Sequence, residues 1–180
     1  MSKLNKTVCF TGHRPNKLPG GYDYNSDKNK ELSFVLENKI LELLEKGYEH
    51  FICGGALGVD QIAFEVLCSL RDTGCNISIE IAIPFKNQTS NWMQSSKDLY
   101  NSQLTRADKL TFVDEIYNYN KNFEIGVYHP AKMEMRNRYM VDNSDIVIAV
   151  HDGTKGGTYN CISYAKKMNK EIILINEIFR

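Results

Sequence analysis

The sequence predicts an α/β protein with a doubly wound, mostly parallel sheet flanked by helices. Short apolar or alternating segments of strand character recur between longer segments whose apolar residues are spaced three and four apart. Several strand segments end in glycine-containing turns, as βα units do. A chain of 180 residues is long enough to bury its own core, so we expect residues 1–180 to form a single domain.

The elements follow one another in a regular alternation. Helices are expected at about residues 32–47, 59–71, 89–107 and 132–143 and around 162–168, and the helix at 89–107 would carry the only tryptophan. Residues 16–29 are rich in Pro, Gly, Asn and Asp, which predicts a loop, and the aromatic segment 114–130 has no clear period. The strands are expected at residues 7–10, 50–53, 77–83, 109–113, 145–150 and 172–175.

Composition limits the partners of this chain. Its 22 basic and 22 acidic residues cancel, so no global field attracts a nucleic-acid backbone or an anionic membrane. No apolar run approaches the ~20 residues of a membrane span, and no signal-peptide core precedes the first strand. We therefore expect a cytoplasmic protein without a membrane partner.

The cysteines and histidines predict neither disulfides nor a metal site. The five cysteines are an odd number without a CxxC pair, which favours buried, reduced thiols. The four histidines lack the spacing of metal ligands, so we expect no metal and no resident cofactor.

A glycine-rich turn follows the second strand. Gly54, Gly55 and Gly58 stand between this strand and a helix, where backbone N–H groups can approach an anion and the helix adds its positive N-terminal end. Their spacing matches neither G-x-G-x-x-G nor the P-loop. By itself such a turn is more often an ordinary βα connection.

Three turns together predict a site. Residues 11–14, 53–60 and 152–158 each follow an expected strand, and the carboxyl ends of parallel strands meet at one rim. Two of these turns open helices, while Arg14 and Lys155 add positive charge. This convergence favours a phosphorylated ligand.

Five motifs are spread over nearly the whole chain. They are Thr11-Gly12-His13-Arg14-Pro15; Gly54-Gly55-Ala56-Leu57-Gly58-Val59-Asp60; Pro84-Phe85 with Gln88 and Trp92; Arg136-Asn137 with Tyr139-Met140-Val141-Asp142; and Gly156-Gly157-Thr158. Together they resemble the motifs of the SLOG superfamily, specifically its YpsA/YoqJ-like proteins. The resemblance implies a Rossmann-like sheet that binds a nucleotide or a nucleotide-derived ligand. Related proteins often pair through helices, so a homodimer is one expected assembly.

The superfamily also contains the Lonely-guy phosphoribohydrolases, which cleave the base from a nucleotide. Met133, Arg136, Met140 and Ser144-Asp145 match the spacing around the catalytic arginine of those enzymes, so the resemblance gives Arg136 that role. Their catalytic glutamate corresponds to Asn160 here. An amide can neither transfer a proton nor stabilise an oxocarbenium-like centre by charge.

A replacement carboxylate would be needed for such chemistry. Asp152, Glu65 and Asp60 are the candidates. If the protein is an enzyme, we expect Asp152 and Arg136 to be its catalytic residues. Trp92 would either stack on a base or pack on the sheet. The expected ligand contacts are Thr11, Gly12, His13, Arg14, Gly54, Gly55, Ala56, Gly58, Asp60, Trp92, Arg136, Gly156, Gly157 and Thr158.

These observations lead to three hypotheses for the function. The first is binding of a nucleotide-derived small molecule, such as an ADP-ribose or cyclic nucleotide signal. The second is an enzyme that hydrolyses an N-glycosidic bond or transfers a ribosyl group. The third is nucleic-acid binding, because the DprA proteins share the superfamily, but zero net charge argues against it.

Overall fold

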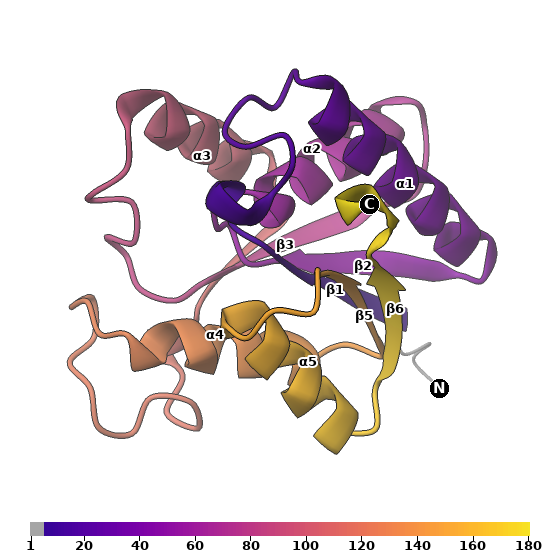
Figure 1. The fold of residues 1–180 in the computed structure, drawn as a ribbon. Coiled ribbons are helices and arrows are strands. Elements are labelled where there is room, and N and C mark those ends of the chain that lie inside the picture. Colours follow the sequence, from indigo (N-terminus) through magenta and orange to yellow (C-terminus); the bar gives the residue numbers. More distant parts are fainter. Residues whose placement is uncertain (1–5) are drawn as a thin grey trace.

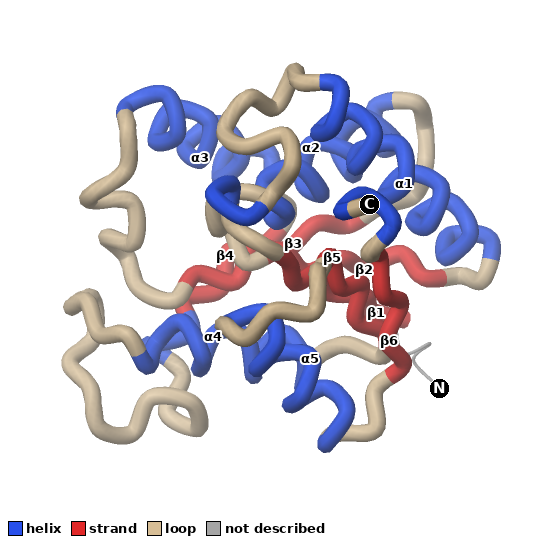
Figure 2. Tube along the Cα trace, viewed as in Figure 1, coloured by secondary structure: helices blue, strands red, loops and turns tan. Residues whose placement is uncertain are grey.

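The structure is a computed structural model that describes residues 6–180. Six parallel strands form one sheet in the order β4-β3-β2-β1-β5-β6 (Figure 1, Figure 2). This confirms the predicted α/β class and the parallel sheet. The strands are β1 (Lys6–Gly12), β2 (Tyr48–Cys53), β3 (Ser78–Ile83), β4 (Lys109–Phe112), β5 (Ile146–Val150) and β6 (Glu171–Ile175).

Helices cover both faces of the sheet. In Figure 1, α1 (Asp27–Glu45), α2 (Val59–Asp72) and α3 (Gln94–Arg106) lie on one face, and α4 (Ala131–Asp142) and α5 (Gly157–Lys167) lie on the other. Short 3-10 turns add η1 (Pro15–Lys17), η2 (Val113–Glu115) and η3 (Glu177–Phe179). Among the helices of the described chain, none is long and apolar enough to cross a bilayer.

The strand order reverses beside β1. The chain builds outward from β1 through β2 and β3 to β4, then returns so that β5 pairs with the free side of β1. In open parallel sheets the carboxyl end of such a reversal is where ligands bind. The sheet therefore places the expected rim at the ends of β1 and β5.

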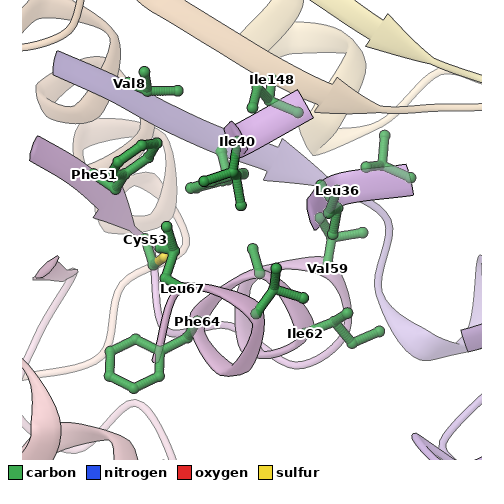
Figure 3. Packing of buried hydrophobic residues seen from close by; sticks show 14 of the residues in the cluster. Val8, Leu36, Ile40, Phe51, Cys53, Val59, Ile62, Phe64, Leu67 and Ile148 are labelled. Carbon is green, nitrogen blue, oxygen red and sulfur yellow. The ribbon is translucent and has the colours of Figure 1, made fainter. Parts of the chain in front are cut away.

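Two apolar cores hold the layers together, and alternation along the strands divides residues between them. Val8 and Phe10 of β1 face α1 and α2, whereas Cys9 faces α4 and α5. Figure 3 shows Val8, Phe51 and neighbouring side chains filling the space above α2. All five cysteines are free; four are buried, as the sequence predicted, and Cys75 is partly exposed.

Two predicted helix starts are wrong. The expected loop 16–29 ends at Ser26, whose side chain accepts a hydrogen bond from the N–H of Asn29 at 3.3 Å and caps α1 at Asp27. The expected helix at 89–107 begins only at Gln94, because the polar segment 87–91 forms turns instead. Trp92 therefore lies before α3 and not on it.

A buried ion pair orders the irregular aromatic segment before α4. Lys132 and Asp114 are both fully buried, with Nζ and Oδ2 2.8 Å apart. Nζ also donates to the carbonyl of Glu124 at 2.6 Å, and Oδ2 accepts from the N–H of Gly126 at 2.8 Å. Breaking such a pair leaves a charge without a partner or water, so it fixes the path of the segment onto α4.

Glu80 of β3 is a second buried charge, on the α4 side of the sheet. Its carboxylate accepts hydrogen bonds from Tyr139 at 2.6 Å, Thr111 at 2.7 Å and His50 at 2.9 Å, and Lys109 lies 3.2 Å away. Burial by itself raises the pKa of Glu80, but these hydrogen bonds outweigh it and lower the pKa to about 2.

We expect Glu80→Gln to lower the free energy of unfolding by on the order of 2–3 kcal/mol at pH 7, because the unfolded carboxyl has a pKa of about 4.3. A folded pKa below the unfolded one contributes stability above pH ~4.3 that is lost as the pH falls toward 2. Urea unfolding of both proteins from pH 7 to pH 3 should therefore show the difference shrinking. The exposed Glu37→Gln is the control; an equal, pH-independent loss in both variants would contradict this assignment.

Candidate functional site

A cavity of about 450 Å³ opens where the strand order reverses. It lies between the end of β1, the start of α2, the middle of α4 and the start of α5. The structure thus brings three of the predicted segments to one site. The predicted residues that line it are Thr11, Gly12, His13, Arg14, Ala56, Asp60, Arg136, Gly156, Gly157 and Thr158.

Other lining residues were missed by sequence reasoning. Asn137 follows Arg136 in its motif, and Met133 belongs to the spacing match around Arg136; they lie one helical turn apart on α4 and both line the cavity. Lys17 and Asn16 come from the loop before α1, where composition carries no signal for a ligand. The remaining members of this group are Phe10, Thr154 and Tyr159.

In the first glycine turn, several backbone N–H groups are hydrogen-bonded within the protein. Three of its N–H donors are already used: Gly58 donates to the Tyr24 hydroxyl at 2.9 Å, Ala56 to Asp60 Oδ2 at 3.2 Å, and Val59 to the carbonyl of His13 at 3.3 Å. Gly54, Gly55 and Gly58 are absent from the described lining of the cavity. These three glycines therefore shape the wall, and their assignment as ligand contacts stays a prediction.

Close approach explains why two of these positions are glycine. Gly58 has φ +93°, and a Cβ there would lie 2.5 Å from the carbonyl oxygen of His13. A Cβ on Gly54 would overlap the guanidinium of Arg136. Both glycines allow neighbouring segments to reach the rim, which a side chain would push apart.

Arg136 is the charged centre of the site. It is 5% exposed, donates from Nη1 to the carbonyl of Gly54 and from Nε to Asn137 Oδ1 at 3.0 Å, and lies 3.9 Å from Asp60 Oδ2. Burial raises the pKa of Asp60, and the charge of Arg136 opposes this shift. The pair is thus a buried charge pair whose cation also faces the cavity.

The second glycine turn is open. Gly156 precedes α5 without a side-chain cap, and residues 152–157 are exposed. The first N–H groups of any helix lack partners within it, so those of Gly157 and Thr158 are free to meet an anion. Lys17 reaches the same turn, with Nζ 3.0 Å from the hydroxyl of Thr154.

His13 and Asp152 form a pair at the edge of the cavity. Their Nε2 and Oδ1 atoms are 2.7 Å apart. Hydrogen bonds from Thr154, and then from His13, hold the pKa of Asp152 well below its usual range, while burial lowers the pKa of His13. Of this pair only His13 lines the cavity, so Asp152 stands behind it.

Trp92 does not reach the described cavity lining. Its ring contacts the ring of Tyr100 edge-on at a centroid distance of 5.6 Å, and the Tyr100 hydroxyl accepts from Gln88 at 2.8 Å. Trp92 therefore packs against Tyr100 of α3, and its assignment as a ligand contact stays a prediction. Asn160 lines a neighbouring cavity of about 220 Å³ between α4 and α5.

Comparison with known proteins identifies the family. The model of the YpsA family, described as the YspA SLOG family, matches residues 8–177. The chain belongs to the YspA SLOG family. This confirms the resemblance drawn from the motifs.

Relatives of this SLOG protein occur in bacilli. It is 41% identical over 138 residues to the SPbeta prophage-derived protein YoqJ of Bacillus subtilis, covering 73% of this chain and 81% of YoqJ. It is 31% identical over 167 residues to a UPF0398 protein of Halalkalibacterium halodurans, covering 92% of this chain and 83% of that protein.

Two solved structures share the fold of this SLOG protein. DNA processing protein A of Helicobacter pylori, described with a single-stranded DNA binding mode, has a TM-score of 0.57 at 19% identity, covering 97% of this chain and 68% of that one. DNA processing protein A of Streptococcus pneumoniae has a TM-score of 0.50 at 12% identity, covering 96% and 60%. At these identities the likeness establishes the fold alone.

We expect Arg136→Met in this SLOG protein to lower the free energy of unfolding by about 3–5 kcal/mol, because it leaves the buried Asp60 carboxylate and the Gly54 carbonyl without their partner. Adding Asp60→Asn should restore part of the loss by removing the unpaired charge. Urea unfolding measures both effects.

Arg138→Met is the matched control on the same helix. Arg138 pairs with Glu134 on the surface, so its loss should cost less than about 1 kcal/mol. Equal losses for Arg136→Met and Arg138→Met would show that the buried pair does not hold the rim.

Proposed function

We propose that this protein binds a nucleotide or a nucleotide-derived small molecule, of the ADP-ribose or cyclic nucleotide type, in the cavity at the carboxyl ends of β1 and β5. The observation that carries the proposal is the meeting of two arginines with an uncapped helix N-terminus. Arg14 and Arg136 line the same cavity as Gly157 at the start of α5. Guanidinium groups and free helix N–H groups both favour phosphate oxygens.

The charge balance of the cavity supports an anion. The chain has no net charge, but Arg14, Lys17 and Arg136 line the cavity against Asp60 as the one described carboxylate. Burial, and also the charge of Arg14, lower the pKa of Arg136, so these two cations repel each other. A bound phosphate would relieve that repulsion.

The size of the cavity favours more than a bare phosphate. A volume of about 450 Å³ lies within the ~300–1,000 Å³ of small-molecule sites. Tyr159 follows the phosphate-binding residues proposed on α5, is 43% exposed and offers a ring face to a base. The side-chain amide of Asn137 offers both a donor and an acceptor.

Binding is better supported than cleavage. Asp152 is tied to Thr154 and His13 and is outside the described lining, and Glu65 pairs with Arg106 at 2.6 Å. Among the three carboxylates considered from the sequence, only Asp60 lines the cavity, where it accepts from Ala56 and neighbours Arg136. An N-glycosidase or ribosyl transferase would have to use Asp60 as its carboxylate, or His13 backed by Asp152 as its proton donor.

Single-stranded DNA binding is the second candidate. One structural neighbour, DNA processing protein A of Helicobacter pylori, is described as binding single-stranded DNA. The two proposals share phosphate recognition and differ in the reach of the positive charge, because a DNA strand needs a basic track beyond one cavity.

We expect Gly157→Glu to weaken binding of ADP-ribose, AMP or cyclic AMP at least tenfold, because a carboxylate at the start of α5 occupies the proposed phosphate position and repels it. A Cβ at Gly157 meets no atom within 4 Å, so the fold should tolerate the change. Isothermal titration with each nucleotide measures the affinity.

Gly157→Gln is the matched control, because it has the same shape without the charge, and it should retain more affinity than Gly157→Glu. No binding of any nucleotide to the unmodified protein would refute the proposal. Salt-dependent binding of an oligothymidylate, followed by fluorescence anisotropy, would favour the second candidate instead. Chromatography of the titrated nucleotides detects free base, which would move the assignment from binding to cleavage.

A further inference from the structure

Two histidines and an aspartate meet beside the cavity. His13 and His151 each follow the paired residues Gly12 and Val150, so parallel register brings them side by side at the ends of β1 and β5. Their ring centroids are 5.0 Å apart. One ligand atom each from His13, His151 and Asp152 lies within 4.8 Å of the others. The spacing in the sequence does not predict this group, because His13 lies 138 positions or more before His151 and Asp152.

The hydrogen bonds of His151 fix which of its nitrogens can bind a metal. Nε2 lies 2.7 Å from the carbonyl oxygen of Thr154, and a carbonyl only accepts, so Nε2 carries the proton. Nδ1 therefore keeps its lone pair, and it accepts the N–H of Gly153 at 3.2 Å. Histidines that bind metals typically donate their other N–H to a carbonyl or a carboxylate in this way.

The other two ligand atoms are already close together. Nε2 of His13 lies 2.7 Å from Oδ1 of Asp152. Ligand atoms that share one ion at ~2.1 Å lie about 3–3.5 Å apart, so an ion can replace the shared proton after a small separation of the two side chains. The side chain of Asp152 is 27% exposed, which gives an ion a route from solvent.

We propose that His13, His151 and Asp152 form a binding site for a divalent transition metal, held by two imidazole nitrogens and one carboxylate oxygen. Such a mixed set suits zinc and cobalt and leaves coordination positions open. His13 also lines the cavity, so the open positions would lie at the edge of the space proposed for the nucleotide. The metal site does not depend on that proposal, since the three ligands are present without it.

The ligand atoms already have hydrogen-bond partners that a metal ion would have to replace: the N–H of Asp152 lies 3.2 Å from His13 Nε2, and the N–H of Gly153 lies 3.2 Å from His151 Nδ1. The same contacts make a hydrogen-bonded brace between the ends of β1 and β5. Asp152 Oδ1 also accepts from the N–H of Thr154 at 2.9 Å and from its hydroxyl at 2.7 Å. Lys17 adds a positive charge on the other side of Thr154.

The test uses the full chain without a histidine tag and adds Zn²⁺ or Co²⁺ alone. We expect isothermal titration to give one ion per chain, and Co²⁺ to give visible absorption from nitrogen and oxygen ligands without a thiolate band. Asp152→Asn should weaken binding at least tenfold, because it keeps the acceptor for the Thr154 N–H but removes the charge. His151→Gln, checked by circular dichroism, should weaken binding to a similar degree.

His129→Gln is the control, because it removes an exposed imidazole from the segment before α4. Cys75→Ser tests for zinc held by the partly exposed thiol. Binding should be unchanged in both. The proposal is overturned if the unmodified protein binds neither ion, if Asp152→Asn and His151→Gln bind as tightly as it does, or if Cys75→Ser abolishes the signal.

Discussion

The guanidinium of Arg136 connects helices on the two faces of the sheet, close to where the strand order reverses. Arg136 belongs to α4, on one face of the sheet. Its guanidinium donates to the carbonyl of Gly54, just after β2, and lies beside Asp60 at the start of α2, on the other face. These groups are largely buried, so the loss of one partner leaves the others poorly solvated. The strands end before this polar cluster, so its hydrogen bonds and charges, and not strand pairing, hold the rim together.

That constraint gives the two glycine turns different roles. The turn before α2 uses three of its N–H donors within the protein, on Tyr24, Asp60 and His13, and these hydrogen bonds fix its shape. The turn before α5 is exposed and uncapped, so its donors remain available. One wall of the cavity therefore sets its shape, and the other offers hydrogen bonds to what enters it.

The fold was predictable because its signals are local. Apolar periodicity located every strand of the described sheet, and alternation of strands with helices predicted parallel pairing. The start of α3 was misplaced because polar residues before Gln94 prefer turns, a competition that periodicity does not register. The pairing of β5 with β1 was not derivable, since it depends on contacts between segments far apart in the chain.

The site was predictable as a set of segments but less so as a set of contacts. Parallel strand ends share a rim, which correctly gathered Arg14, Asp60 and Gly157 around one cavity. Sequence could not tell that the N–H of Gly58 is already occupied, because its partner Tyr24 comes from a distant loop. The meeting of His13 with Asp152 across neighbouring strands was hidden for the same reason.

The contrast between the two walls also bears on how such a protein can diverge. Changes at Gly54 or Gly58 disturb buried partners and would cost stability that a marginally stable fold can rarely spare. Changes at Arg14, Lys17 or Tyr159 alter exposed side chains around the same cavity. Relatives of this protein could therefore change ligand through substitutions at these exposed positions without losing the fold.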